Sequence, residues 1–180
     1  NIDVPQREIA EAGPAELRFL GPIAQTCRTL YAATRSALDR GRCPIILGGD
    51  HSLAMGSVAA VADAGRARGL RVGVIWLDAH GDMNGPGTSP SGNIHGMPLA
   101  CLLGRGADPL TTISERRPAV DPQDVALIGI RAIDGPESAL IRSSGVRVWT
   151  MRAIDEHGMR SVIGDAIEDL GRECDLLHVS

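Results

Sequence analysis

The chain has 180 residues, of which 43% are hydrophobic and 22% charged, and its formal net charge is −4. This length allows one domain with a sizeable buried core. The acidic balance and the few aromatic residues (two Trp, one Tyr and one Phe) argue against a nucleic-acid groove, which needs clustered Lys and Arg beside stacking rings. No apolar run reaches the roughly 20 residues that a membrane helix needs, so we expect no membrane partner.

The four cysteines lie far apart in the sequence and form no Cys-x-x-Cys pair. Such spacing favours reduced, buried thiols in a cytoplasmic protein over a disulfide framework. The chain begins at Asn1 without a methionine and stops at Ser180, directly after a strand-like run. We therefore expect a single domain over residues 1–180 that is incomplete at both ends, as a segment of a longer protein would be.

The first half of the chain alternates helical and extended patterns. Apolar side chains at helical spacing predict an amphipathic helix over residues 23–38. A short apolar run at 44–47 predicts the first strand, and a helix is expected from 52 to about 66. The apolar stretch 70–77 predicts a buried strand, after which a loop rich in Gly, Pro and Ser extends over 81–96.

The second half continues the same alternation. A short helix over 98–103 has proline in its first turn, where a missing N–H costs nothing. Strands are predicted at 124–130, 146–149 and 175–179, and an amphipathic helix at 159–173. Because the strands are apolar throughout, both faces of the sheet should be covered. The sequence therefore predicts an α/β fold of three layers, a mostly parallel sheet with helices on both faces.

Polar clusters follow three of the predicted strands where each strand ends. The first cluster comprises residues 49–51, the second 78–82 and the third 131–134. In an open parallel α/β sheet, ligands bind outside the carboxyl ends of the strands. We therefore expect these three clusters, far apart in sequence, to meet at one edge of the sheet.

The run Asp78-Ala79-His80-Gly81-Asp82 is the most informative of these clusters. Its three ligand-type residues alternate, so in an extended chain their side chains share one side. Oxygen and imidazole ligands without thiolates suit a divalent ion such as manganese rather than a structural zinc. A carboxylate at a strand end can also bridge two ions, and a paired-metal centre makes a nucleophile from water. The alternative is a loop with capping carboxylates.

The other histidines differ in what their context indicates. His51 follows Gly-Gly-Asp and by itself would suit a helix cap, but its expected place at the same sheet edge favours metal ligation. His95 lies in the long loop 81–96, where it could move protons near neutral pH; the alternative is a solvent-exposed histidine. His157 and His178 are expected to be structural. No dinucleotide or phosphate-loop glycine motif follows a strand, which argues against nucleotide binding.

Three motifs, in this order along the chain, resemble the ureohydrolases and within them the arginases. The likeness extends over about residues 1–180 and implies an arginase-like fold with two manganese ions at the strand ends. The motifs are Gly48-Gly49-Asp50-His51-Ser52, Asp78-Ala79-His80-Gly81-Asp82-Met83-Asn84 and Ser91-Gly92-Asn93-Ile94-His95-Gly96-Met97-Pro98.

The resemblance also implies a role for each residue of the metal motif. His51, Asp78 and Asp82 would hold one manganese ion, and Asp78 would bridge to a second ion that His80 also binds. A metal-bridging hydroxide, oriented by Asp82, would attack the guanidinium carbon of L-arginine and yield L-ornithine and urea. His95 would shuttle protons between solvent and the leaving amine.

The substrate residues follow from the same resemblance. Asn84, Ser91 and Asn93 match positions that contact the α-carboxylate of arginine, and Asp134 and Glu137 match positions on its α-amino side. Agmatine lacks that carboxylate, so the loop favours arginine. The alternatives are an agmatinase or another guanidino-hydrolase, and a non-catalytic ureohydrolase-like subunit.

Two departures from the family pattern affect the expected activity. Ala132 stands where many arginases have an aspartate, and its lack of charge would loosen substrate contacts or alter the support of neighbouring residues. The remaining metal ligands of the family, two aspartates in an Asp-x-Asp run, would lie beyond Ser180, as would a further guanidinium-binding carboxylate. The 180-residue segment alone should therefore bind manganese weakly and catalyse poorly. The family also implies a homo-oligomer, a trimer or a hexamer.

Overall fold

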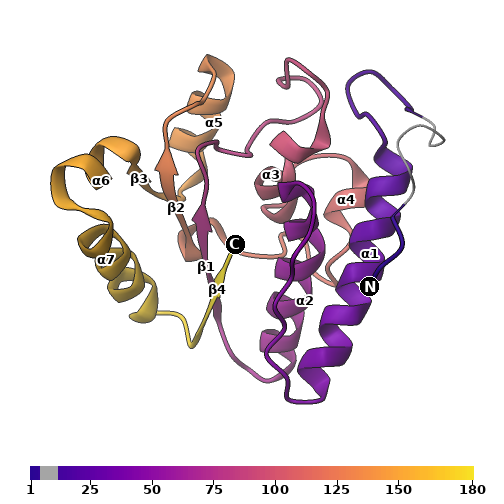
Figure 1. Ribbon diagram of the computed structural model, residues 1–180, viewed down its shortest axis with the longest axis horizontal. Coiled ribbons are helices and arrows are strands. Elements are labelled where there is room, and N and C mark those ends of the chain that lie inside the picture. Colours follow the sequence, from indigo (N-terminus) through magenta and orange to yellow (C-terminus); the bar gives the residue numbers. More distant parts are fainter. Residues whose placement is uncertain (5–11) are drawn as a thin grey trace.

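A four-stranded parallel sheet forms the centre of the computed structural model, which describes residues 1–4 and 12–180 (Figure 1). The strand order is β3-β2-β1-β4, so β1 and β2 are central and have a neighbour on each side. All three pairings are parallel. The strands are β1 (Val72–Leu77), β2 (Val125–Ile130), β3 (Arg147–Thr150) and β4 (Leu176–Val179).

Helices cover both faces of this sheet, which confirms the three-layer α/β prediction (Figure 1). Helices α1 to α4 lie on one side of the sheet, where α2 contacts β1 and α1 packs on α2, and α6 and α7 lie on the other, with α5 near the carboxyl ends of the strands. The helices are α1 (Leu20–Asp39), α2 (Ala54–Ala67), α3 (Pro98–Leu102), α4 (Asp108–Thr111), α5 (Gly135–Ser144), α6 (Met151–His157) and α7 (Met159–Gly171).

Two apolar clusters fill the spaces between the layers. Trp76 and Leu127 of β1 and β2 belong to one cluster with residues of α1, α2 and α3, whereas Ile75 and Ile128 belong to the other, with residues of α6 and α7. Every residue of β2 and all but the last of β1 are buried, as their continuous apolar sequence predicts. The outer strands β3 and β4 are partly exposed. None of the helices described is long and apolar enough to cross a membrane.

The predicted first strand at residues 44–47 is wrong. The structure has no strand there among the described residues, and residues Ile45 and Leu47 are 84% and 91% exposed. A strand needs a neighbour to satisfy its N–H and C=O groups. In the described part of the chain the sheet ends at β4, and residues 44–47 pair with nothing in it. An apolar run is thus insufficient to make a strand.

The helices α5 and α6 were not expected from the sequence, although α5 begins with clear signals. Asp134 is its N-cap and accepts a hydrogen bond from the backbone N–H of Glu137 at 2.8 Å. Pro136 stands in its first turn, and Gly145 ends it with a φ of 90°. A capping Asp, an early Pro and a terminal Gly are the usual boundary signals of a helix.

Candidate metal centre

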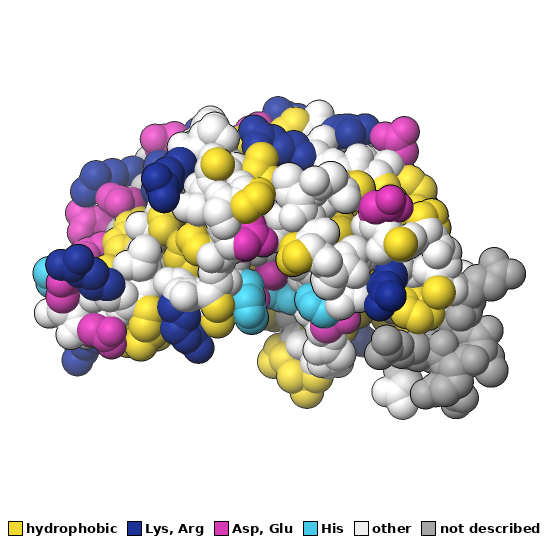
Figure 2. Space-filling view, turned by 90° about the horizontal axis from the view of Figure 1, so that it is seen from above, with side chains coloured by type: hydrophobic (Ala, Val, Ile, Leu, Met, Phe, Trp, Pro, Cys, Tyr) yellow, Lys and Arg dark blue, Asp and Glu magenta, His cyan; other side chains and the backbone are white. Residues whose placement is uncertain are grey.

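The three polar clusters meet at the carboxyl edge of the sheet, as predicted. Backbone hydrogen bonds join the segment after β1 to the segment after β2: Asp78 N–H donates to Ile128 O at 3.1 Å, and Arg131 N–H to Ala79 O at 2.8 Å. His51 reaches the same place from a 3₁₀ turn before α2, which Asp50 caps. Figure 2 shows histidine and acidic side chains together in the middle of this face.

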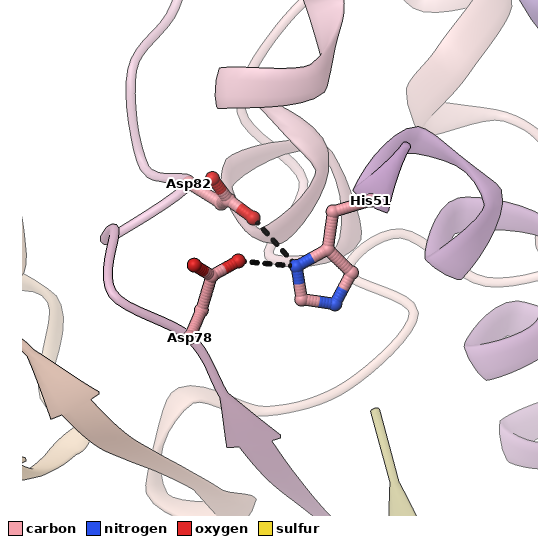
Figure 3. A group of neighbouring side chains, drawn as sticks. All are labelled: His51, Asp78 and Asp82. Atoms are coloured by element: carbon pink, nitrogen blue, oxygen red, sulfur yellow. Dashed lines mark hydrogen bonds and ion pairs between the residues drawn. The ribbon is translucent and has the colours of Figure 1, made fainter. Parts of the chain in front are cut away.

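His51, Asp78 and Asp82 form the centre of the site (Figure 3). The Nδ1 atom of His51 lies 2.6 Å from Oδ2 of Asp78 and 2.9 Å from Oδ2 of Asp82. The candidate ligand atoms of the three residues all lie within 4.8 Å of one another. One imidazole nitrogen therefore faces two carboxylates at once.

The donor set fits a divalent cation. The Oδ2 atom of Asp82 is buried and has no hydrogen-bond partner in the part of the chain that the structure describes, although it lies beside His51. A single ring proton cannot serve two carboxylates fully, and a buried carboxylate oxygen without a partner is costly. A cation among the three residues would satisfy both oxygens and the ring nitrogen together. Oxygen and imidazole donors of this kind suit manganese.

Two further side chains hold the His51 ring, and the sequence did not indicate either. Trp76 stacks on the imidazole, with ring centroids 4.1 Å apart and planes inclined by 25°. The hydroxyl of Ser180 lies 3.0 Å from Nε2. If Nε2–H donates to that hydroxyl, Nδ1 keeps its lone pair for a cation, which is the usual arrangement of a metal-binding histidine.

The electrostatics of the cluster separate the two carboxylates. Burial disfavours the charged form of His51, but the neighbouring carboxylates of Asp82 and Asp78 outweigh it and raise its pKa. Burial raises the pKa of Asp82, and the negative charge of Asp78 raises it further. His51 lowers this pKa but compensates only in part. For Asp78, burial is outweighed by the N–H of His80 and by His51, so its pKa is lowered. Asp82 is thus the carboxylate that most needs a nearby positive charge.

His80 lies beside the cluster rather than in it. Its backbone N–H donates to Oδ1 of Asp78 at 3.0 Å, and its Nδ1 lies 3.1 Å from the same oxygen. The side chain of His80 is 62% exposed. The two oxygens of Asp78 therefore face different histidines, His51 on one side and His80 on the other. This arrangement suits a carboxylate shared between two neighbouring cation positions.

The backbone at Asp82 is unusual. Its φ is 52°, in the left-handed region, which costs an L-residue about 1–2 kcal/mol and is tolerated best by Asn and Asp. The side chain of Asp82 is only 4% exposed. The turn therefore directs this carboxylate inward to His51, and the surrounding residues must hold it there.

A cavity of about 410 Å³ contains the cluster. It is lined by every residue that the sequence predicted for the site, so the tertiary structure brings the whole set together. These residues are His51, Asp78, His80, Asp82, Asn84, Ser91, Asn93, His95, Asp134 and Glu137. A larger cavity of about 740 Å³ adjoins it along α1, but its walls are mainly apolar and it shares only the rim residues Asp50, Asn93 and His95.

The predicted substrate residues take two different positions around this cavity. Asn84 is buried, and its side-chain amide donates to Oδ2 of Asp134 at 3.1 Å. Ser91 and Asn93 lie on the loop, where Ser91 Oγ accepts from the backbone N–H of Asn93 at 3.2 Å. His95 is exposed at the rim, with Nδ1 3.8 Å from Oδ2 of Asp50. The inner group is thus fixed by hydrogen bonds and the outer group borders solvent.

The parallel sheet with helices on both sides makes this an α/β protein, and the His–Asp–Asp cluster at the carboxyl edge of the sheet is its candidate metal site. The chain also matches the family model described as "Arginase family" over residues 1–180. The chain belongs to the arginase family.

Curated relatives and solved structures agree with this assignment. The chain is 44% identical to the arginase of Bacillus caldovelox, covering 99% of this chain and 59% of the relative. It is 39% identical to the arginase of Bacillus subtilis (strain 168), covering 99% and 58%. Among solved structures, the native arginase of Bacillus caldovelox superposes with a TM-score of 0.90 at 43% identity, covering 99% of this chain and 58% of that one.

A more distant solved structure has the same fold. Entamoeba histolytica arginase in complex with L-ornithine superposes with a TM-score of 0.89 at 36% identity, covering 99% of this chain and 59% of that one. These matches confirm the arginase-like fold. The chain spans less than two thirds of the length of the relatives that it matches.

Proposed function

We propose that the full-length gene product containing this chain hydrolyses L-arginine to L-ornithine and urea, with manganese as its cofactor. The proposal depends above all on the buried carboxylate of Asp82, whose Oδ2 faces Nδ1 of His51 at 2.9 Å and has no hydrogen bond among the described residues. It lies beside Asp78, in a cavity that also contains the predicted substrate residues. Similarity to arginases at about 40% identity supports it, and so does the binding of L-ornithine by the Entamoeba histolytica arginase.

The metal ligands within the chain would be His51, Asp78, His80 and Asp82. His51, Asp78 and Asp82 would hold one ion, and Asp78 would share a second with His80, because its two oxygens face different histidines. When bound, two manganese ions would lower the pKa of a water molecule and so supply a nucleophile at neutral pH. The ions would also neutralise the carboxylates of Asp78 and Asp82, which repel each other when no metal is bound.

The residues of the chain would bind the substrate and move its protons. The acidic cavity attracts a guanidinium cation. Asp82 would accept a hydrogen bond from the attacking water and orient it toward the guanidinium carbon. When the bond from this carbon to the side-chain nitrogen breaks, the leaving amine takes up a proton. His95 lies at the solvent-exposed rim, where it could carry that proton inward.

The remaining lining residues would distinguish arginine from other guanidino compounds. Asn84, Ser91 and Asn93 offer amide and hydroxyl groups for the α-carboxylate, and Asp134 and Glu137 offer negative charge for the α-amino group. Ala132 also lines the cavity and contributes no charge. Agmatine would leave the carboxylate-binding groups unpaired, which lowers its affinity.

Urea release by the full-length gene product tests this proposal. L-Arginine and agmatine are assayed in parallel, with and without added manganese, and Asp78→Asn serves as the variant without the shared ligand. Manganese-dependent urea from arginine, lost in Asp78→Asn, is the expected result. Urea from agmatine alone would identify another guanidino-hydrolase. Urea from neither would favour a non-catalytic subunit. Homo-oligomeric assembly and cytoplasmic location stay predictions.

A further inference from the structure

The N-terminal end of α5 holds Met83 and Asn84, the two residues that directly follow Asp82. Oε1 of Glu137 accepts a hydrogen bond from the backbone N–H of Met83 at 3.0 Å. Oδ2 of Asp134 accepts one from the side-chain amide of Asn84 at 3.1 Å. Asp134 also caps the helix by accepting from the N–H of Glu137 at 2.8 Å. Two carboxylates, themselves linked, thus bind the chain directly after Asp82.

The hydrogen bond to Glu137 holds the peptide group between Asp82 and Met83, which determines how the Asp82 side chain is oriented. The peptide group between Asp82 and Met83 is held on both sides: its N–H by Glu137, and its C=O by the N–H of Ala100 in α3 at 3.1 Å. The plane of this peptide group fixes the ψ angle of Asp82. Because Asp82 is in the left-handed region, with a φ of 52°, such outside support is needed to keep it there.

The Glu137 carboxylate is closely packed against Gly81. Glu137 is 4% exposed. A methyl group at Gly81 would lie 2.9 Å from Oε1 of Glu137 and 2.6 Å from Cδ1 of Ile141. The φ of Gly81 lies outside the left-handed region, so this position needs glycine for space rather than for backbone freedom. The loop and the helix are therefore shaped to bring the carboxylate against the Met83 N–H.

We infer that Glu137 is a positioning residue for the metal site: its carboxylate fixes the Asp82–Met83 peptide and so aims Asp82 at His51. The inference rests on the proposed metal site and goes beyond the substrate-binding role considered for Glu137. One oxygen of Glu137 is committed to the Met83 N–H, at a distance that depends on the full length of the side chain. Manganese binding should therefore depend on the length of the residue 137 side chain and not on its charge.

Two conservative variants separate length from charge. Glu137→Asp keeps the charge but is one methylene too short for the Met83 N–H, whereas Glu137→Gln keeps an oxygen at full reach and loses the charge. Ser138→Ala is the matched control, since it removes another side-chain hydrogen bond of the same helix, from Arg142 at 2.9 Å. The metal-free full-length gene product is titrated with Mn²⁺, and free Mn²⁺ is measured by electron paramagnetic resonance. Urea-induced unfolding of the same samples shows which variants are folded.

We expect Glu137→Asp to weaken manganese binding about tenfold or more, as loss of support to a metal ligand typically does. Glu137→Gln and Ser138→Ala should bind within about threefold of the wild type, and Glu137→Gln should raise KM for arginine only. A loss in Glu137→Gln equal to or greater than that in Glu137→Asp would overturn the inference, and so would unchanged binding in both. If Glu137→Asp does not fold, retained binding in Glu137→Gln supports the inference and lost binding overturns it.

These outcomes also separate the inference from the proposed function. Failure of the wild type to bind manganese would overturn both. A wild type that binds manganese and releases urea, together with Glu137→Asp that binds equally well, would overturn the inference alone. A wild type that binds manganese but releases no urea, with weakened binding in Glu137→Asp, would overturn the proposed function and support the positioning role.

Discussion

Replacement of Asp82 by Asn should make the metal-free protein more stable while it abolishes the response to manganese. The side chain of Asp82 is 4% exposed, and among the residues that the structure describes its Oδ2 has no hydrogen-bond partner. Asn has the same shape, tolerates the left-handed φ of 52° and carries no charge. Its amide N–H groups could also donate to the neighbouring carboxylate of Asp78. The variant thus removes the electrostatic cost of the site without a change in packing.

The expected gain follows from the buried oxygen. A buried polar group without a partner costs about 1–3 kcal/mol. Taking the lower end, because His51 compensates Asp82 in part, Asp82→Asn should gain about 1 kcal/mol, or about 2–4 °C in Tm for a domain of this size. Burial raises the pKa of Asp82, so its stabilising contribution is present below 3.8 and is lost as pH rises through the folded-state pKa. The gain should therefore be seen at neutral pH and vanish in acid.

Thermal unfolding of the full-length gene product, with a chelator or with manganese, measures both effects. At about one hundred times the Kd, manganese should stabilise the wild type by about 2.7 kcal/mol, and this term should be absent from Asp82→Asn. The order of Tm values should therefore reverse: the variant is higher in chelator and the wild type is higher in manganese. A variant less stable than the wild type in chelator would refute the view that Asp82 is held at a cost. An unchanged manganese shift would refute its role as a ligand.

Two further predictions concern residues outside the metal site. Asp63→Ala should lower the free energy of unfolding by about 3–5 kcal/mol in urea denaturation, because Asp63 is the buried ion-pair partner of Arg66 and also accepts hydrogen bonds from the Tyr31 hydroxyl at 2.8 Å and a backbone N–H at 2.9 Å. Asp108→Ala, at an exposed ion pair, is the control and should change little; equal losses would contradict the argument. Burial lowers the pKa of His178 below 6.5, so its contribution to stability is present above 6.5 and is lost as pH falls toward the folded-state pKa. His178→Gln should flatten that acid decline, and an unchanged pH profile would contradict the assignment.

The regular elements that were predicted correctly are those whose signal is local. The apolar periodicity of residues 23–38 and 159–173 corresponds to α1 and α7, and the continuous apolar runs correspond to β1 and β2. The run 44–47 has the same apolar character but pairs with nothing that the structure describes, so it is not a strand. Strand formation depends on a neighbouring strand at any distance along the chain, whereas helix periodicity needs only the segment itself.

The sequence by itself determined the types and spacing of the candidate ligands. Asp78, His80 and Asp82 follow a buried strand at alternate positions, and a parallel sheet brings such strand ends to one edge. Only the tertiary structure decided which atoms meet. It places Oδ2 of Asp82 2.9 Å from Nδ1 of His51 and leaves His80 beside the cluster. It also stacks Trp76 on the His51 ring. These contacts join residues far apart in the chain, and their geometry depends on packing between layers, which no local pattern encodes.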